Sequence, residues 1–192
     1  MDDRKPKVLN MALDLFVRYG FRRTTMGDIA KAVGISRPTL YLLYENKEDI
    51  FRATLEMYYG QVLAEAGRRI DKADTLAQKL EAVLLTWIIE PYVLVHQNPD
   101  ARDLCEITFS FARDVRERLT DLFIDQLEEV VATSPEVDIA ALEARGFSAR
   151  TIAAVLAHSS SGLKIVDPTL EDLESHLGAL ILMAVDTAKR WK

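Results

Sequence analysis

The sequence predicts an all-α protein, and two observations carry that prediction. Apolar residues recur at helical spacings of three and four along the chain, and no segment alternates with a period of two for long enough to form a half-buried strand. Glycine and proline are scarce, with eight and six residues among 192, which is low for a protein rich in loops or strands. We expect about nine helices, divided between a small N-terminal domain and a larger C-terminal helical domain.

The first helix is expected to end at Gly20, and the second is expected to begin at Thr25. Gly20 follows a helical apolar stripe and can adopt the left-handed conformation that closes a helix. Thr25 and Asp28 have the spacing of a capping box, in which each side chain bonds the backbone amide of the other residue. A helix over residues 26–33 follows from that cap.

Two further helices follow a glycine turn. Gly34 breaks the second helix, and Ser36 has the side chain and the position of an N-terminal cap for a short third helix. Asn46 begins a fourth helix in the same way, and this helix runs from residue 47 to about residue 70. We expect it to be the rigid element that joins the two domains.

The segment beyond Asp74 is strongly apolar. Residues 83–89 are apolar nearly all round, so we expect this helix to lie in the centre of the C-terminal domain. Pro91 is expected to bend or end it, because proline lacks the amide hydrogen that continues a helix. Ser148 and Thr169 are expected to cap the last two helices.

Charge is distributed unevenly between two parts of the chain. The net charge is −6, but residues 1–47 carry nine Lys and Arg against five Asp and Glu, a balance of +4. Residues 48–192 carry fifteen against twenty-five, a balance of −10. A basic first part favours a polyanionic partner for that part, although a chance distribution of surface charge has the same appearance.

Several classes of protein are disfavoured by composition and motifs. No charge-free stretch approaches the roughly 18–20 apolar residues of a membrane-spanning helix, and the charged N-terminus does not resemble a secretory signal. The lone Cys105 fits a reducing cytoplasm. We find no phosphate loop, no nucleophile elbow and no histidine pair at metal-ligand spacing, so we expect no enzyme activity, no cofactor and no metal. A thiol site built from Cys105 and His158 is the enzymatic alternative.

Residues 30–40 have the layout of a helix-turn-helix. Ala30 is small where the two helices would cross, and Gly34 supplies the tight turn. Ile35 and Leu40 are apolar anchors for the second helix of the motif. The start of that helix is then exposed, which is the position from which a helix-turn-helix contacts base edges in the major groove. Any two short helices joined at a glycine share part of this pattern.

A longer set of spaced features surrounds this motif. The features are Gly20-Phe21, Thr24-Thr25-Met26, Asp28-Ile29-Ala30, Gly34-Ile35-Ser36, Thr39-Leu40-Tyr41, Tyr44 and Asn46-Lys47-Glu48. Together they resemble the N-terminal DNA-binding domain of the TetR (tetracycline-repressor) family of bacterial regulators. The resemblance implies a cytoplasmic, sequence-specific regulator, normally a repressor, with a DNA-binding domain over residues 1–47. It also implies a ligand-binding and dimerisation domain over residues 48–192, and an inverted-repeat operator in double-stranded DNA.

The resemblance assigns DNA-contacting roles as well. Two cap hydroxyls and a lysine at the start of the fourth helix are expected to meet phosphates, and exposed residues of the recognition helix are expected to meet bases or backbone. The predicted DNA-binding residues are Thr25, Ser36, Arg37, Thr39, Tyr41 and Lys47. Leu43 stands where the family often has a polar phosphate contact, so either it and Leu42 read thymine methyl groups or binding is weaker there. The N-terminus is a basic arm or a frayed tail, with the cations Arg4, Lys5 and Lys7.

For the C-terminal domain the resemblance implies a small-molecule pocket. Large aromatic side chains with few charges would suit an apolar or aromatic ligand, although each of them also suits an ordinary core. The candidate lining residues are Met57, Gln61, Trp87, Tyr92, Cys105, Phe109, Phe123 and His158. The alternative is a domain that binds a protein partner and senses no small molecule.

The last two helices are expected to form a homodimer. The final helix carries an apolar stripe that includes Leu177 and Ile181, and the helix before it has a small-residue face that includes Ala153 and Ala157. Small residues let helices approach closely, so two helices from each subunit would make a four-helix seam. A ligand would release DNA by shifting the long fourth helix and, with it, the spacing of the two recognition helices.

Overall fold

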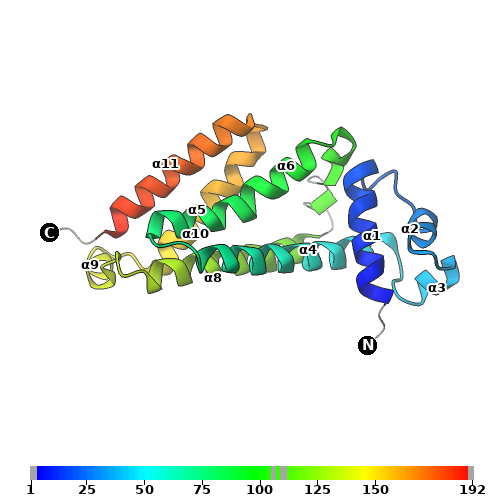
Figure 1. Ribbon diagram of the computed structural model, residues 1–192, viewed down its shortest axis with the longest axis horizontal. Helices are drawn as coiled ribbons and strands as arrows, with labels where there is room; N and C mark the ends of the chain where they lie inside the picture. The colour runs from blue at the N-terminus through cyan, green and yellow to red at the C-terminus, as the bar shows by residue number, and fades with distance from the viewer. Residues whose placement is uncertain (1–3, 105–106, 109–111, 190–192) are drawn as a thin grey trace. The chain divides into compact units, whose positions relative to one another are not determined.

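The computed structural model describes residues 4–104, 107–108 and 112–189. Within these residues every regular element is helical, apart from an isolated antiparallel bridge between Val137 and Lys189, so the all-α prediction is confirmed. The elements are α1 (Arg4–Tyr19), α2 (Met26–Val33), α3 (Arg37–Tyr41), α4 (Lys47–Ile70), α5 (Leu76–Leu84), the π-helical η1 (Leu85–Ile89), α6 (Glu90–His96), η2 (Pro99–Arg102), α8 (Arg113–Thr133), α9 (Ile139–Ala144), α10 (Ala149–Leu163), η3 (Lys164–Val166) and α11 (Leu170–Ala188), drawn in Figure 1.

The chain divides into two compact units. The first combines Met1–Gly60 with Leu94–Leu119, and the second combines Gln61–Val93 with Thr120–Lys192. Helices α4 and α8 therefore begin in the first unit and end in the second. These units describe packing, and the functional boundary after residue 47, where α4 begins, stays a prediction.

The core of the first unit gathers aromatic side chains from α1, α4 and the loop after α1. Phe16, Phe21 and Phe51 pack with ring centroids 5.2 to 5.5 Å apart, a separation at which tilted and edge-on rings attract. Ile29 of α2 and Leu40 of α3 are fully enclosed in the same core. Because α2 and α3 are too short to be stable alone, this packing is what holds them in place.

The apolar segment that was expected to be central is buried in the second unit. Val83 and Ile88 are at most 1% exposed. The helical path does not end at Pro91, because α5 continues through the π-helical η1 into α6. The Glu90 amide donates to the Leu85 carbonyl, which is the i to i+5 bond of a π-helix. This wider turn has changed the hydrogen-bond register before the chain reaches proline, so the missing amide hydrogen is tolerated.

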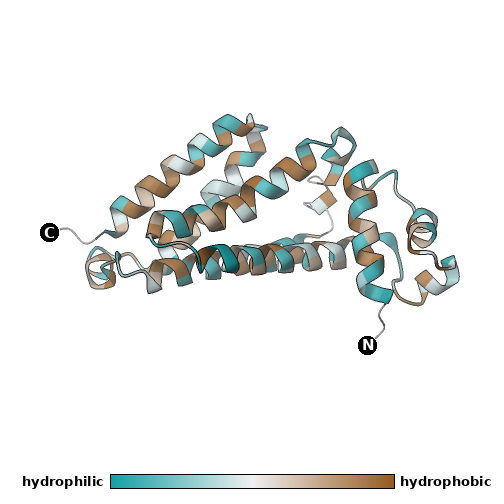
Figure 2. Ribbon diagram, in the orientation of Figure 1, coloured by the Kyte–Doolittle hydropathy of each residue, from teal (hydrophilic) through white to brown (hydrophobic). Residues whose placement is uncertain are grey.

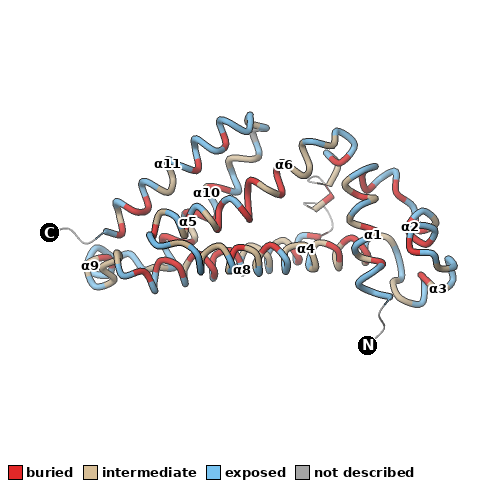
Figure 3. Tube along the Cα trace, in the orientation of Figure 1, coloured by how far each residue is buried: buried red, intermediate tan, exposed pale blue. Residues whose placement is uncertain are grey.

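Helices α10 and α11 pack against each other in the second unit. Three of the residues that suggested a dimer seam are buried within the subunit, since Ala153, Ala157 and Leu177 are at most 4% exposed, whereas Ile181 is half-buried. Figure 2 shows hydrophobic and hydrophilic residues mixed along α11, and Figure 3 shows that many of its residues are exposed. The two helices carry exposed apolar side chains at other positions, among them Val155, Leu182 and Met183, which are 56%, 61% and 57% exposed.

Candidate nucleic-acid interface

Helix α2 begins at the predicted capping box. The Asp28 amide donates to the Thr25 hydroxyl at 3.2 Å, and the Thr25 amide donates to the Asp28 carboxylate at 2.9 Å. Hydrogen bonds from the Thr25 hydroxyl and amide lower the pKa of Asp28 below its usual value. Both residues are exposed, so this well-capped start of α2 faces solvent.

The turn between α2 and α3 has the predicted geometry. Gly34 has a left-handed φ of 80°, and its amide donates to the Ala30 carbonyl at 3.0 Å. Ala30 is 2% exposed and Leu40 is fully buried, while Ile35 is half-buried against the same core. These residues therefore have the roles predicted from the sequence: a small residue at the crossing, a glycine in the turn and two apolar anchors. Together they form a helix-turn-helix.

The start of α3 faces solvent. The Ser36 hydroxyl caps the helix by accepting from the Thr39 amide at 3.2 Å. Arg37 and Tyr41 are exposed, whereas Thr39 is half-buried and its hydroxyl lies 2.8 Å from that of Ser36. Two predicted base-contacting side chains thus project from the recognition helix, and Thr39 serves first to hold its beginning.

The two leucines that follow α3 differ sharply in exposure. Leu42 is 86% exposed, and Leu43 packs against the core of the first unit. Leu42 is therefore the leucine that can reach a thymine methyl group. The sequence offered no signal to separate them, since the two are adjacent, identical and placed where a short helix ends.

Lys47 points toward the protein. Its Nζ donates to the carbonyls of Phe21 and Thr24, at 2.7 Å in each case, and lies 4.1 Å from the centroid of the Phe21 ring. Burial lowers the pKa of the Lys47 ammonium below its usual value, and the negative charges of Glu48 and Asp103 oppose that shift. The expected phosphate contact rested on position in the chain, which does not encode the direction of a long, flexible side chain.

The basic residues at the N-terminus lie in a helix. Arg4, Lys5 and Lys7 belong to the first turn of α1, so from residue 4 onward neither an extended arm nor a frayed tail describes them. The Nζ of Lys5 lies 5.8 Å from the centroid of the Tyr44 ring. Tyr44 is half-buried, and burial raises the pKa of its hydroxyl.

Two of the predicted ligand-binding residues meet in the second unit. Trp87 and Phe123 are buried and stacked, with ring centroids 4.9 Å apart and planes inclined by 17°. The Trp87 Nε1 donates to the side-chain oxygen of Gln126 at 2.7 Å, and the Gln126 amide group donates to the Leu63 carbonyl at 3.1 Å. Because the protein itself satisfies the indole N–H, this cluster is a packed part of the core.

The remaining candidates lie in other environments. Tyr92 is buried, and its hydroxyl donates to the Pro168 carbonyl ahead of α11. On α4, Met57 is half-buried and Gln61 is exposed. Two candidates lie outside the described residues, Cys105 and Phe109.

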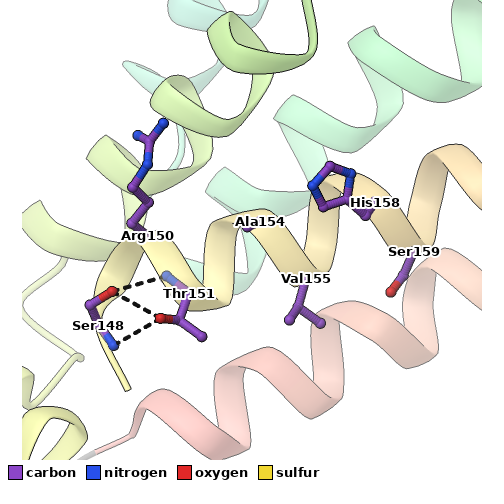
Figure 4. A pocket seen from close by; sticks show the side chains of 7 residues that line it. All are labelled: Ser148, Arg150, Thr151, Ala154, Val155, His158 and Ser159. Carbon is purple, nitrogen blue, oxygen red and sulfur yellow. Dashed lines mark hydrogen bonds between the residues drawn. The ribbon is translucent and has the colours of Figure 1, made fainter. Parts of the chain in front are cut away.

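His158 lies on the exposed surface of α10. It lines an open hollow of about 580 Å³, whose other lining residues are Ser148, Arg150, Thr151, Ala154, Val155 and Ser159 (Figure 4). All of these belong to α10 and its cap, so the hollow follows one helix face and does not include the Trp87 cluster.

Among the described residues, no group of three or more His, Cys, Asp or Glu is arranged to hold a metal ion. No helix in the described part of the chain is long and apolar enough to cross a membrane.

Residues 8–54 match a known family, described as bacterial regulatory proteins of the tetR family. The chain is 37% identical over 67 residues to the HTH-type transcriptional repressor ComR of Escherichia coli, which covers 32% of each protein. It is 42% identical over 52 residues to the biofilm operon icaADBC HTH-type negative transcriptional regulator IcaR of Staphylococcus epidermidis, which covers 27% of this chain and 28% of that protein. The similarity thus spans about a third of the length of these curated relatives.

A solved structure extends the likeness to nearly the whole chain. The transcriptional regulator FadR from Bacillus subtilis in complex with stearoyl-CoA superposes with a TM-score of 0.62, and the alignment covers 94% of this chain and 95% of that one. The sequence identity is 16%, so this likeness concerns the fold alone.

Proposed function

We propose that this chain, whose residues 8–54 match the tetR family of bacterial regulatory proteins, is a sequence-specific transcriptional repressor of that family. The observation that carries the proposal is the helix-turn-helix, in which Gly34 turns the chain and Arg37 and Tyr41 face solvent at the recognition helix. A helix-turn-helix presents that part of its second helix to the major groove. The names of ComR and IcaR, a repressor and a negative regulator, support the sign of regulation.

The proposed partner is double-stranded DNA with an inverted-repeat operator, which implies a cytoplasmic protein. The basic balance of residues 1–47 supports this partner, because phosphate neutralisation supplies much of the affinity of DNA-binding proteins. The proposed DNA-facing residues are five of those expected from the sequence, Thr25, Ser36, Arg37, Thr39 and Tyr41, with exposed Leu42 added to them. The sixth, Lys47, is not among them, because its ammonium donates to the carbonyls of Phe21 and Thr24.

Selection of bound fragments from the source genome, followed by titration, tests DNA binding. Arg37→Ala and Tyr41→Ala should each weaken specific binding by about 1–3 kcal/mol, while the fold is kept. Arg68→Ala is the matched control, since Arg68 is an exposed arginine of the second unit that pairs with Glu65. If both variants bind the selected fragments as well as the wild type at moderate salt, the assignment is wrong.

A two-fold operator requires a two-fold protein, and we propose a homodimer through the exposed faces of α10 and α11. Val155, Leu182 and Met183 support this choice, because large apolar side chains on two packed helices favour burial against a second copy. Leu182→Glu together with Met183→Glu should give folded monomers in sedimentation. The control is Leu122→Glu on α8, where Leu122 is 41% exposed. A wild-type chain that sediments as a monomer at micromolar concentration contradicts the dimer.

The effector is proposed to be an apolar or aromatic small molecule that binds the C-terminal domain and releases the operator. The buried Trp87–Phe123 stack supports this chemistry, and FadR, which shares the fold, is described with stearoyl-CoA. With Trp191→Phe, Trp87 is the one remaining tryptophan and reports binding by its fluorescence. A coupling of about 1–3 kcal/mol would weaken operator binding about 5- to 150-fold, and operator would weaken ligand binding by the same factor.

The second candidate is a C-terminal domain that binds a protein partner and senses no small molecule, and one observation favours it. The indole N–H of Trp87 is already satisfied inside the protein, so this cluster needs no ligand to complete it. A long-chain acyl-CoA and a planar aromatic compound are the two probes for the fluorescence titration. Saturable binding of either probe, with release of the operator, supports a C-terminal domain that senses a small molecule. If neither probe binds, a C-terminal domain that binds a protein partner is supported, and the proposal of DNA binding is unaffected.

A further inference from the structure

The loop between α1 and α2 is held on two sides by side chains of opposite charge. On one side, the Lys47 ammonium donates to the carbonyls of Phe21 and Thr24, at 2.7 Å in each case. On the other side, the Asp103 carboxylate accepts from the amides of Phe21 at 3.0 Å and Arg22 at 2.8 Å. The acceptors of the loop therefore bind a cation and its donors bind an anion, and hydrogen bonds to charged groups are the strong ones.

The loop also lies close against η2 and the residue that follows it. Gly20 has a left-handed φ of 78°, and a Cβ added there would stand 2.3 Å from the Asp100 carbonyl oxygen and 3.0 Å from an Asp103 carboxylate oxygen. The buried Thr24 hydroxyl donates to the Gly20 carbonyl at 2.7 Å. Backbone meets backbone here, which requires glycine.

The two charges come from different predicted functional domains. Lys47 ends the expected DNA-binding domain, whereas Asp103 belongs to the residues expected to bind ligand and dimerise, although both lie in the first compact unit. The loop leads directly into the cap of α2, and the Phe21 ring beneath the ammonium packs on Phe16 and Phe51. Whatever fixes this loop therefore fixes the beginning of the helix-turn-helix.

We propose that Lys47 and Asp103 form a clasp that positions the helix-turn-helix for DNA. They act as positioning residues: the clasp presents α2 and α3 in one orientation, so DNA does not have to order them on binding. This inference rests on the proposed DNA-binding function. It gives Lys47 a different role from a phosphate contact, and the two roles differ in their dependence on salt.

Salt titration of operator binding separates these roles. The salt slope is the fall in the logarithm of the binding constant per tenfold rise in salt. Removal of a lysine that neutralises one phosphate makes this slope shallower by about 0.9. For a clasp residue, Lys47→Met should instead weaken binding about tenfold at every salt concentration with the slope unchanged, since it disturbs preorganisation and releases no counterion. Asp103→Asn should weaken binding in the same direction, although removing a negative charge from a DNA-binding protein would by itself strengthen binding.

Hydrogen exchange in the full-length protein without DNA tests the clasp directly. Asp103→Ala should speed exchange of the Phe21 and Arg22 amides by about tenfold or more, and Asp103→Asn, which keeps one accepting oxygen, should have a smaller effect. Asp100→Asn is the matched control: it removes one carboxylate of the same turn, whose side chain pairs with Arg23. This variant should leave the exchange rates of the Phe21 and Arg22 amides unchanged.

Three results overturn the proposal. Unchanged exchange of the two amides in Asp103→Ala contradicts the clasp, as does a slope that falls by about one unit in Lys47→Met. Stronger operator binding by Asp103→Asn shows that its charge matters and its position does not. Failure of the wild-type protein to bind any genomic fragment contradicts the proposed function instead, and the exchange experiment still decides whether the clasp exists.

Discussion

Two regions of the molecule, residues 8–54 and the second compact unit, differ in the sequence separation of the hydrogen bonds within them. In the first region, the caps of α2 and α3 join residues three apart, and the Gly34 turn closes on Ala30. In the second unit, Trp87 bonds Gln126 and Gln126 bonds Leu63, at separations of 39 and 63 residues. Short-range bonds leave a fixed spacing in the sequence, and long-range bonds do not.

This difference explains how far each kind of similarity extends. ComR and IcaR align over 67 and 52 residues, whereas 94% of the chain superposes on FadR at 16% identity. A cap or a glycine turn permits few residue types at each position, while a helical core accepts many combinations that fill the same volume. The first region therefore remains recognisable when the second has kept only its fold.

The largest expected effect tests whether the second unit depends on its long-range cluster. Trp87→Ala removes the stack on Phe123 and leaves Gln126 without its donor, so the free energy of unfolding should fall by about 3–5 kcal/mol. Trp87→Phe keeps an aromatic ring and should lose less, about 1–3 kcal/mol. Denaturant titration measures both. A loss under about 1 kcal/mol for Trp87→Ala would mean that the cluster is not tightly packed and has room for a ligand.

Two glycines with the same backbone conformation test how local the first region is. Gly34→Ala meets only the strain of a left-handed residue, about 1–2 kcal/mol, because nothing lies within 4 Å of the new Cβ. Gly20→Ala meets the same strain and also the Asp100 carbonyl at 2.3 Å, so it should lose roughly 1–3 kcal/mol more. Thermal denaturation of the two variants compares their losses of stability, and the difference between them measures the effect of the close contact between Gly20 and the Asp100 carbonyl. Equal losses would show that the first region is governed by the turn alone.

The capping box of α2 should contribute less, and its contribution should depend on pH. Thr25→Ala is expected to lose about 1 kcal/mol. The pKa of Asp28 is lowered in the folded protein, so its contribution is present above the ordinary value of 3.8 and is lost as the pH falls through the lowered one. In Asp28→Asn this part of the acid profile should be absent. An unchanged profile between the wild type and Asp28→Asn would contradict the assignment.

The smallest effect is expected at a long-range contact on the surface. Arg150 pairs with Asp125 and Glu128 at 2.7 Å, and these hydrogen bonds raise the pKa of its guanidinium, yet the side chain is half exposed. Exposed ion pairs contribute little because water and salt screen them. Arg150→Gln should therefore leave the denaturation midpoint almost unchanged, and any difference should vanish in high salt. A large, salt-independent loss would show that burial alone does not decide which long-range contacts matter.

The sequence by itself determined the elements whose signals are local. Gly20 and Gly34 adopt the left-handed conformation expected of them, and Thr25 and Ser36 cap the helices they were expected to cap. Each of these outcomes depends on a side chain and a backbone group within four residues of each other. Chain position therefore places the two within reach of each other, and packing of the core then holds the short helices in which they lie.

Only the tertiary structure decided where long side chains point and which helix faces remain exposed. Lys47 turns inward because folding brings the carbonyls of Phe21 and Thr24 within its reach, and Leu177 is buried while Leu182 is exposed on the same helix. An apolar stripe shows that a helix has a face to bury but does not show which neighbour covers it. A flexible cation likewise takes the partner that the fold supplies, and here that partner comes from a loop 23 to 26 residues earlier in the chain.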